Sequence, residues 1–112
     1  MTKVECILRP STVIKVKDAL GKLGIKGMTV IEAIGFGSQK GHTEEKWSPE
    51  FDIALLPKTK LEMVVPDDKV DEIIKVIIEV ARTGEIGDGK IFTYPISNAI
   101  RIRTGETGEN AV

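Results

Sequence analysis

The chain has 112 residues, of which 41% are hydrophobic and 29% charged, a composition that suits one compact domain and excludes a multidomain enzyme. Its 16 lysines and arginines nearly balance its 17 aspartates and glutamates, so no overall positive field would draw it onto nucleic acid or a membrane. The single cysteine, Cys6, excludes an internal disulfide, and the start MTKVECILRP lacks the apolar core of a signal peptide. We therefore expect a cytoplasmic protein, and a small domain with few aromatic residues would gain stability as a homo-oligomer.

The first third of the chain predicts a strand, a helix and a second strand. Residues 3–9 alternate apolar and polar side chains, as a half-buried strand does. Apolar residues then recur at helical spacing over 10–23 and stop at Gly24, a residue typical of the position just after a helix. Residues 28–36 fit a second strand.

The rest of the chain contains a long irregular segment and a second set of regular elements. Residues 37–54 follow neither period, and so long an insertion in a compact domain usually has a function. Alternation over 57–65 predicts a third strand, and an apolar stripe over 67–81 predicts a second helix with acidic residues at its start. Residues 90–96 and 99–104 predict two further strands. This order is that of a split βαβ domain, in which two helices cover one face of an antiparallel sheet and the other face requires a partner.

The segment GEIGDGK, residues 84–90, is the first candidate for chemistry. It matches seven positions of a phosphate-binding P-loop, but Ile91 replaces the required Ser or Thr, and the loop joins a helix to a strand, which is the reverse order. A P-loop NTPase is therefore rejected. Its glycines would still allow close approach of the backbone to a ligand, with Lys90 adding a positive charge. The alternative is a simple glycine-rich turn.

Two arginines favour an anion site. On a strand, Arg101 and Arg103 would point the same way, about 7 Å apart, and guanidinium groups bind phosphate bidentately. The alternative is a solvated strand face. Together with the glycine-rich segment, the pair favours a nucleotide site.

Other candidate features predict less. The glycines of residues 35–41 do not have the spacing of a dinucleotide-binding loop, and a lone histidine, His42, cannot build a zinc site or a catalytic triad. Cys6 lies on an apolar strand face and is expected in the core. Trp47 and Phe51 lie in the irregular segment, where they indicate either a partner-binding tip or a loop that folds back on the domain.

Taken together, the stretches TGEIGDGKIFTYP (83–95), IRIRTGE (100–106), GMTVIEAIGFGSQKGHTE (27–44) and LPKTKLEMVVPDD (56–68) resemble the PII nitrogen-signalling proteins. The resemblance covers essentially the whole chain. It implies an α+β, ferredoxin-like βαββαβ domain over residues 1–112 and a homotrimer with nucleotide clefts between subunits. It also implies a T-loop at about 37–55, a nucleotide loop at about 82–90 and a C-terminal segment at about 101–112.

By matching positions, the resemblance implies three sets of ligand-binding residues. Those for ATP or ADP are Thr29, Gly35, Phe36, Gly37, Glu62, Val64, Gly87, Asp88, Gly89, Lys90, Arg101 and Arg103, with the two arginines contributed by a neighbouring subunit. Those for 2-oxoglutarate are Gly37, Gln39, Lys40, Gly41, Lys58 and Gly87, and Gln39 would also bind Mg²⁺. A single amide oxygen suits Mg²⁺, which commonly takes few protein ligands beside phosphates.

The T-loop tip departs from the family pattern. Many relatives carry a modified tyrosine or serine here, whereas this chain has Phe51 and Pro49, which lack a hydroxyl group. We expect no covalent switching at these positions, and Ser48 is left open. The residues expected to contact a partner are Glu44, Lys46, Trp47 and Phe51.

The preferred hypothesis is a non-enzymatic sensor of ATP, ADP and 2-oxoglutarate that regulates an ammonium transporter or a nitrogen-assimilation enzyme or regulator, and reaches the membrane only through a transporter. One alternative is a slow ATPase that uses the same cleft, although no general base is evident near the nucleotide loop. Another is a structural trimer or a metal-tolerance relative of the same fold.

Overall fold

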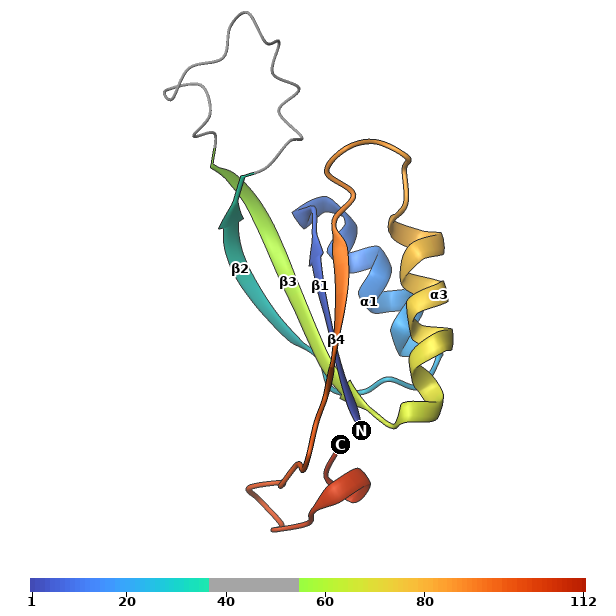
Figure 1. Ribbon diagram of the computed structural model, residues 1–112, viewed down its shortest axis with the longest axis vertical. Coiled ribbons are helices and arrows are strands. Elements are labelled where there is room, and N and C mark those ends of the chain that lie inside the picture. The colour runs from blue at the N-terminus through green and yellow to red at the C-terminus, as the bar shows by residue number, and fades with distance from the viewer. Residues whose placement is uncertain (37–54) are drawn as a thin grey trace, which may run out of the picture.

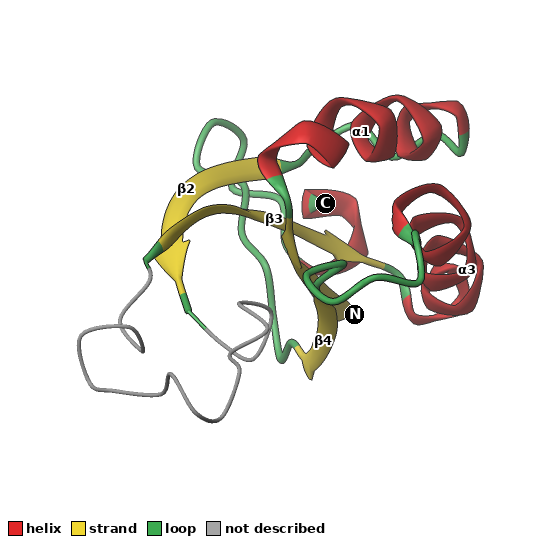
Figure 2. Ribbon diagram, turned by 90° about the horizontal axis from the view of Figure 1, so that it is seen from above, coloured by secondary structure: helices red, strands yellow, loops and turns green. Residues whose placement is uncertain are grey.

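The computed structural model describes residues 1–36 and 55–112 of the chain. Four strands form one antiparallel sheet in the order β2-β3-β1-β4 (Figure 1). They are β1 (Thr2–Leu8), β2 (Thr29–Gly35), β3 (Leu56–Val65) and β4 (Lys90–Pro95). Two helices, α1 (Val13–Lys22) and α3 (Val70–Ala81), lie side by side on one face of the sheet (Figure 2). The predicted α+β architecture is confirmed.

Helix boundaries follow local signals in the sequence. A short 3-10 turn, Pro10–Thr12, leads into α1, and another, Asp67–Lys69, leads into α3. Asp67 is held in place because it accepts a hydrogen bond from the Thr2 hydroxyl at 2.6 Å and pairs with the N-terminal amino group at 3.1 Å. These two contacts lower the pKa of Asp67 and connect the start of α3 to the start of β1.

The core lies between the sheet and the two helices. Side chains on β1 and β3 alternate, so that every second one points toward the helices, and the helices add their apolar stripes. The buried apolar residues are Val4, Cys6, Leu8, Val16, Leu20, Leu61, Met63, Val65, Ile73, Ile77 and Ala81. Burying a side chain as large as Ile73 or Leu20 contributes about 1.5–3 kcal/mol. Cys6 is confirmed as a core residue, and burial raises the pKa of its thiol to about 12.

One predicted strand is wrong. Residues 99–104 form a turn instead, with an isolated bridge between Ile100 and Thr107. Local hydrogen bonds explain the turn: the Gly105 N–H donates to the Arg101 carbonyl at 2.7 Å, and the Arg101 N–H donates to the Glu106 carbonyl at 2.8 Å. Within residues 1–36 and 55–112, this segment pairs with none of the four strands. The argument that Arg101 and Arg103 point the same way on a strand is therefore lost.

The loop of residues 82–89, called the glycine-rich loop below, joins α3 to β4. Its last residue, Gly89, lies against the backbone of β1: an added Cβ would be 1.8 Å from the Ile7 carbonyl oxygen. Gly89 also has φ +105°, a conformation that residues with a side chain rarely adopt. Close packing of this loop on the central strand thus requires glycine at position 89.

Replacing Gly89 tests that packing. Gly89→Ala should lower the free energy of unfolding by about 3 kcal/mol or more, because a backbone clash is added to the strain of positive φ. Gly84→Ala is the matched control: φ is +86° but no described atom lies within 4 Å of the new Cβ, so the cost should be about 1–2 kcal/mol. Urea denaturation measures both values, and equal costs would contradict the close approach to Ile7.

Candidate functional site

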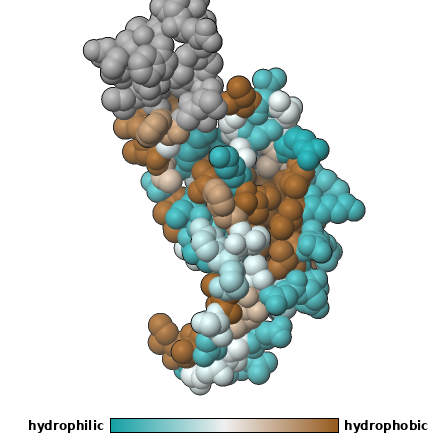
Figure 3. All heavy atoms as spheres, in the orientation of Figure 1, coloured by the Kyte–Doolittle hydropathy of each residue, from teal (hydrophilic) through white to brown (hydrophobic). Residues whose placement is uncertain are grey.

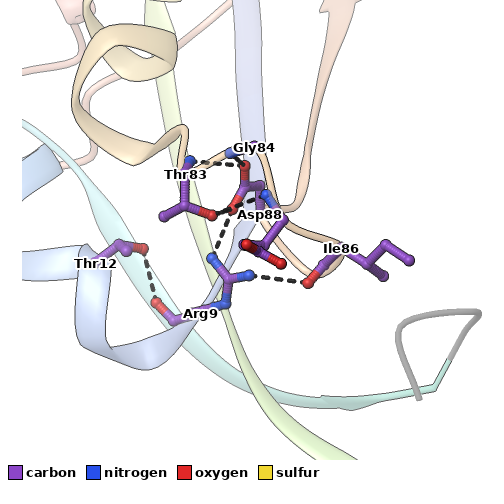
Figure 4. Close-up of polar contacts among 7 residues, drawn as sticks. Arg9, Thr12, Thr83, Gly84, Ile86 and Asp88 are labelled. Atoms are coloured by element: carbon purple, nitrogen blue, oxygen red, sulfur yellow. Dashed lines mark hydrogen bonds and ion pairs between the residues drawn. The ribbon is translucent and has the colours of Figure 1, made fainter. Parts of the chain in front are cut away.

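Asp88 organises the glycine-rich loop. Its Oδ2 accepts hydrogen bonds from the backbone N–H groups of Thr83 at 2.8 Å and Gly84 at 2.9 Å. Its Oδ1 accepts hydrogen bonds from the Thr83 hydroxyl and, at 2.7 Å, from Arg9 Nη1 (Figure 4). The Thr83 hydroxyl and then the Arg9 guanidinium are the largest causes that lower the pKa of Asp88. The carboxylate is therefore ionised and directed at its own loop, and a phosphate would meet backbone amides here.

A cleft lies between this loop and the ends of β2 and β3. Its volume is about 410 Å³, within the range of small-molecule sites. It is lined by Ile7, Gly35, Phe36, Lys58, Glu85, Ile86, Gly87, Asp88, Gly89, Lys90 and Phe92. The fold thus brings seven predicted site residues together: Gly35, Phe36, Lys58, Gly87, Asp88, Gly89 and Lys90. These combine an exposed aromatic ring, two lysines and the backbone of a glycine-rich loop.

Four residues that line the cleft are not among the predicted site residues, namely Ile7, Glu85, Ile86 and Phe92. Arg9 and Thr83, which bind Asp88, were not predicted either. Ile7 pairs with Lys90, and Phe92 is two residues further along the same strand. Side chains two apart share a face of the sheet, so the alternation of β1 and β4 was a usable signal for Ile7 and Phe92. No sequence pattern around Arg9 indicates its role in the loop, because its partner Asp88 lies 79 residues away in the chain.

The remaining predicted nucleotide residues in the described part of the chain lie at the opposite end of the sheet. Thr29 pairs with Glu62, whereas Gly35 pairs with Leu56, and six strand steps between residues 29 and 35 correspond to about 20 Å. Val64 lies on β3 two residues beyond Glu62. The C-terminal segment with Arg101 and Arg103 also extends from the end remote from the glycine-rich loop (Figure 1). The predicted nucleotide residues of one chain therefore form two groups, called half-sites below, at opposite ends of the sheet.

Arg101 of the second half-site forms an ion pair within the C-terminal segment. Arg101 Nη1 lies 3.0 Å from Glu106 Oε1, and that carboxylate also accepts from the Thr104 hydroxyl at 2.9 Å. Ile100 and Ile102 beside Arg101 are 65% and 99% exposed, and Figure 3 shows apolar side chains protruding from this segment. Apolar side chains this exposed are typical of a surface that contacts another molecule.

The sheet face away from the helices carries a compact cluster of four charges, Lys3, Glu5, Lys60 and Glu62. Each lysine nitrogen lies 3.7–3.8 Å from a carboxylate oxygen of both glutamates. Glu5 is only 8% exposed, and the Tyr94 hydroxyl donates to it at 3.2 Å. Partial burial and then this bond to Glu5 raise the pKa of Tyr94. The cluster is neutral overall, so this face could be covered without leaving an uncompensated charge.

Several predicted residues fall outside the described ranges. They are Gly37, Gln39, Lys40, Gly41, Glu44, Lys46, Trp47 and Phe51. Within residues 1–36 and 55–112, no group of three acidic, histidine or cysteine side chains could hold a metal ion. No helix in the same ranges is long and apolar enough to cross a membrane.

The fold and the cleft together define a ferredoxin-like α+β domain with a cleft of small-molecule size where its sheet meets a glycine-rich loop. A family model described as "Nitrogen regulatory protein P-II" matches residues 1–106. The nitrogen regulatory protein P-II of Rhodobacter capsulatus is 56% identical over 112 residues, and that of Haemophilus influenzae 53%, each match covering 100% of both chains. The crystal structure of Arabidopsis thaliana PII bound to citrate matches with a TM-score of 0.82 and 48% identity, covering 99% of this chain and 91% of that one. The chain belongs to the PII nitrogen regulatory protein family, whose members are signal transducers and not enzymes.

The hydrogen bonds of Asp88 predict a specific pH dependence. Because the pKa of Asp88 is lower in the folded chain, its carboxylate stabilises the fold above the unfolded pKa of about 4. That stabilisation is lost as the pH falls below about 4 toward the folded pKa. Asp88→Asn should therefore lower the melting temperature by several degrees at pH 7, and the difference from wild type should shrink in acid.

Melting curves between neutral and strongly acidic pH measure this effect. Asp18→Asn is the control, because Asp18 is an exposed carboxylate on α1 whose ion pair with Lys17, at 3.6 Å, lies at the surface. A constant difference between Asp88→Asn and wild type at every pH would contradict the role assigned to the carboxylate.

Proposed function

We propose that this chain is a cytoplasmic, homotrimeric sensor that binds ATP or ADP between protomers and binds 2-oxoglutarate together with Mg²⁺ and ATP. Its T-loop, about residues 37–55, would then regulate an ammonium transporter or a nitrogen-assimilation enzyme or regulator. Nucleotide and 2-oxoglutarate binding are general in the family, which supports these ligands. The balanced charge of the chain argues against nucleic acid as a partner.

The observation that carries the proposal is the division of the predicted nucleotide residues into two half-sites. The glycine-rich loop, Gly35 and Phe36 lie at one end of the sheet, and Thr29, Glu62, Val64, Arg101 and Arg103 lie at the other. A nucleotide that contacts both half-sites needs two copies of the chain. Head-to-tail contacts that close after three copies would create three equivalent clefts.

The chemistry of the two half-sites fits a nucleotide. Backbone amides of the glycine-rich loop and Lys90 suit phosphate oxygens, while exposed Phe36 offers an apolar surface beside them. Guanidinium groups of the neighbouring protomer would add charge-assisted hydrogen bonds. Lys58 lines the same cleft beside Gly87, where a carboxylate of 2-oxoglutarate would lie. When bound, Mg²⁺ would be held by Gln39 and by oxygen atoms of the phosphates and of the 2-oxo acid. The ion would thereby link the nucleotide to the 2-oxo acid.

The position of the cleft connects ligand binding to the T-loop. Phe36 immediately precedes the T-loop, and Lys58 lies three residues after it; both line the cleft. A bound ligand therefore contacts the chain on both sides of the loop. ATP and ADP, which differ by one phosphate, would favour different T-loop conformations, and a partner that binds one conformation would respond to the nucleotide. Since Pro49 and Phe51 have no hydroxyl, ligand binding would be the signal at these positions.

Calorimetry tests the order of binding. Titration of the protein with 2-oxoglutarate should release heat in the presence of Mg²⁺ and ATP and none in their absence, because the metal ligands are incomplete without nucleotide. ADP in place of ATP should abolish the signal. Equal binding under all three conditions would refute this mechanism.

Mixed oligomers test whether each cleft is shared. Lys90→Ala and Arg103→Ala damage different half-sites, and each should weaken ATP binding, the latter by about 1.5–3 kcal/mol. When the two variants are unfolded and refolded together, about a quarter of the clefts should combine an intact loop with an intact arginine and regain wild-type affinity. A mixture with no high-affinity sites, or a monomer in sedimentation, would contradict the shared cleft.

A further inference from the structure

Arg9 holds the glycine-rich loop from behind. It follows β1 directly, and its Nη1 donates to Asp88 Oδ1 at 2.7 Å while its Nη2 donates to the Ile86 carbonyl at 2.9 Å. A Cβ on Gly87 would lie 3.1 Å from Arg9 Nη2, so the guanidinium packs closely against this residue. One side chain thus contacts residues 86, 87 and 88 in succession (Figure 4).

The bond to the Ile86 carbonyl determines the direction of the next amide. In a planar trans peptide, the C=O of one residue and the N–H of the next point in opposite directions. With the Ile86 carbonyl directed at Arg9, the Gly87 N–H points away from Arg9. Gly87 lines the cleft and Arg9 does not, so this is the side of the loop that a ligand would meet.

Asp88 keeps the guanidinium in this position. Arg9 and Asp88 side chains are 28% and 23% exposed, so the ion pair is partly shielded from water. The same carboxylate is bound by two backbone N–H groups of the loop, at Thr83 and Gly84. Arg9 is therefore committed to the loop and neutralised there, which distinguishes it from Lys90, a lysine that lines the cleft.

We propose that Arg9 is a positioning residue for phosphate binding, which aims the Gly87 N–H into the cleft by fixing the Ile86 carbonyl. The inference rests on the proposed nucleotide function and assigns a role to a residue outside the predicted site. Lys90 would supply charge to the phosphates, whereas Arg9 supplies the orientation of the amide. Gly87, with φ +103°, provides the backbone conformation that this arrangement needs.

The test measures two quantities, the affinity for ATP and the NMR signal of the Gly87 amide. ATP binding is measured by calorimetry, and the protein is labelled with [15N]glycine, which marks 11 amides, one of them Gly87. In wild type, saturating ATP should shift the Gly87 proton signal downfield as it donates to a phosphate. Arg9→Met should weaken ATP binding about tenfold and abolish most of that shift even at saturation.

Two further variants control for charge and for folding. Arg9→Lys keeps the positive charge but has no planar fork to bind both the carboxylate and the carbonyl, so it should retain a smaller shift and lose less affinity than Arg9→Met. Lys15→Met removes an exposed positive charge from α1 and should match wild type. If Arg9→Met does not fold, a full Gly87 shift in Arg9→Lys would overturn the inference.

The outcomes separate this inference from the function on which it rests. Wild type that does not bind ATP would refute the proposed function. Wild type that binds ATP, with Arg9→Met equal to it in affinity or in the Gly87 shift, would refute the positioning role alone. A reduced melting temperature with an unchanged shift at saturation would mean that Arg9 serves only the stability of the fold.

Discussion

The pairing of β1 with β4 is the constraint on which the site depends. It places Lys90 opposite Ile7 and brings the end of the glycine-rich loop to the end of the central strand. Gly89 then packs on the Ile7 carbonyl, and Arg9, two residues further along, reaches the loop from behind. β1 also pairs with β3, whose first residues enter the same region. One central strand thus aligns the loop with Lys58 and with the end of β2.

The two faces of the sheet serve different purposes. One face is sealed by α1 and α3 over an apolar core, where burial raises the pKa of the Cys6 thiol to about 12 and so disfavours the thiolate. The other face carries the neutral cluster of Lys3, Glu5, Lys60 and Glu62 beside exposed Phe92 and Tyr94. The aromatic rings on this face are partly exposed to water, and a second copy of the chain would bury them without leaving an unpaired charge. Both this face and the division of the predicted nucleotide residues fit the oligomer proposed above.

Asp88 illustrates why a motif residue can have a role other than contact with the ligand. The resemblance assigns it to the phosphates, and the structure directs its carboxylate to Thr83, Gly84 and Arg9, so a contact with phosphate would come from its backbone N–H. Its contribution is to order the backbone, whose amides can then bind an anion without reorganising. Gly89 is similar, because packing on β1 accounts for it without any ligand.

The sequence by itself determined the order of the elements, the apolar faces of both helices and the alternation of the strands, because these depend on local periodicity. It also determined the family, through motifs that occur together along the whole chain. It could not determine the fate of residues 99–104, where local hydrogen bonds around Arg101 and Glu106 prevail over an alternating pattern. The tertiary structure alone decided that Arg9 meets Asp88 and that Thr29, Glu62 and Val64 lie far from the glycine-rich loop. Both outcomes follow from strand register, which brings together residues that are distant in the sequence. Register cannot be predicted from the spacing of residues within one segment.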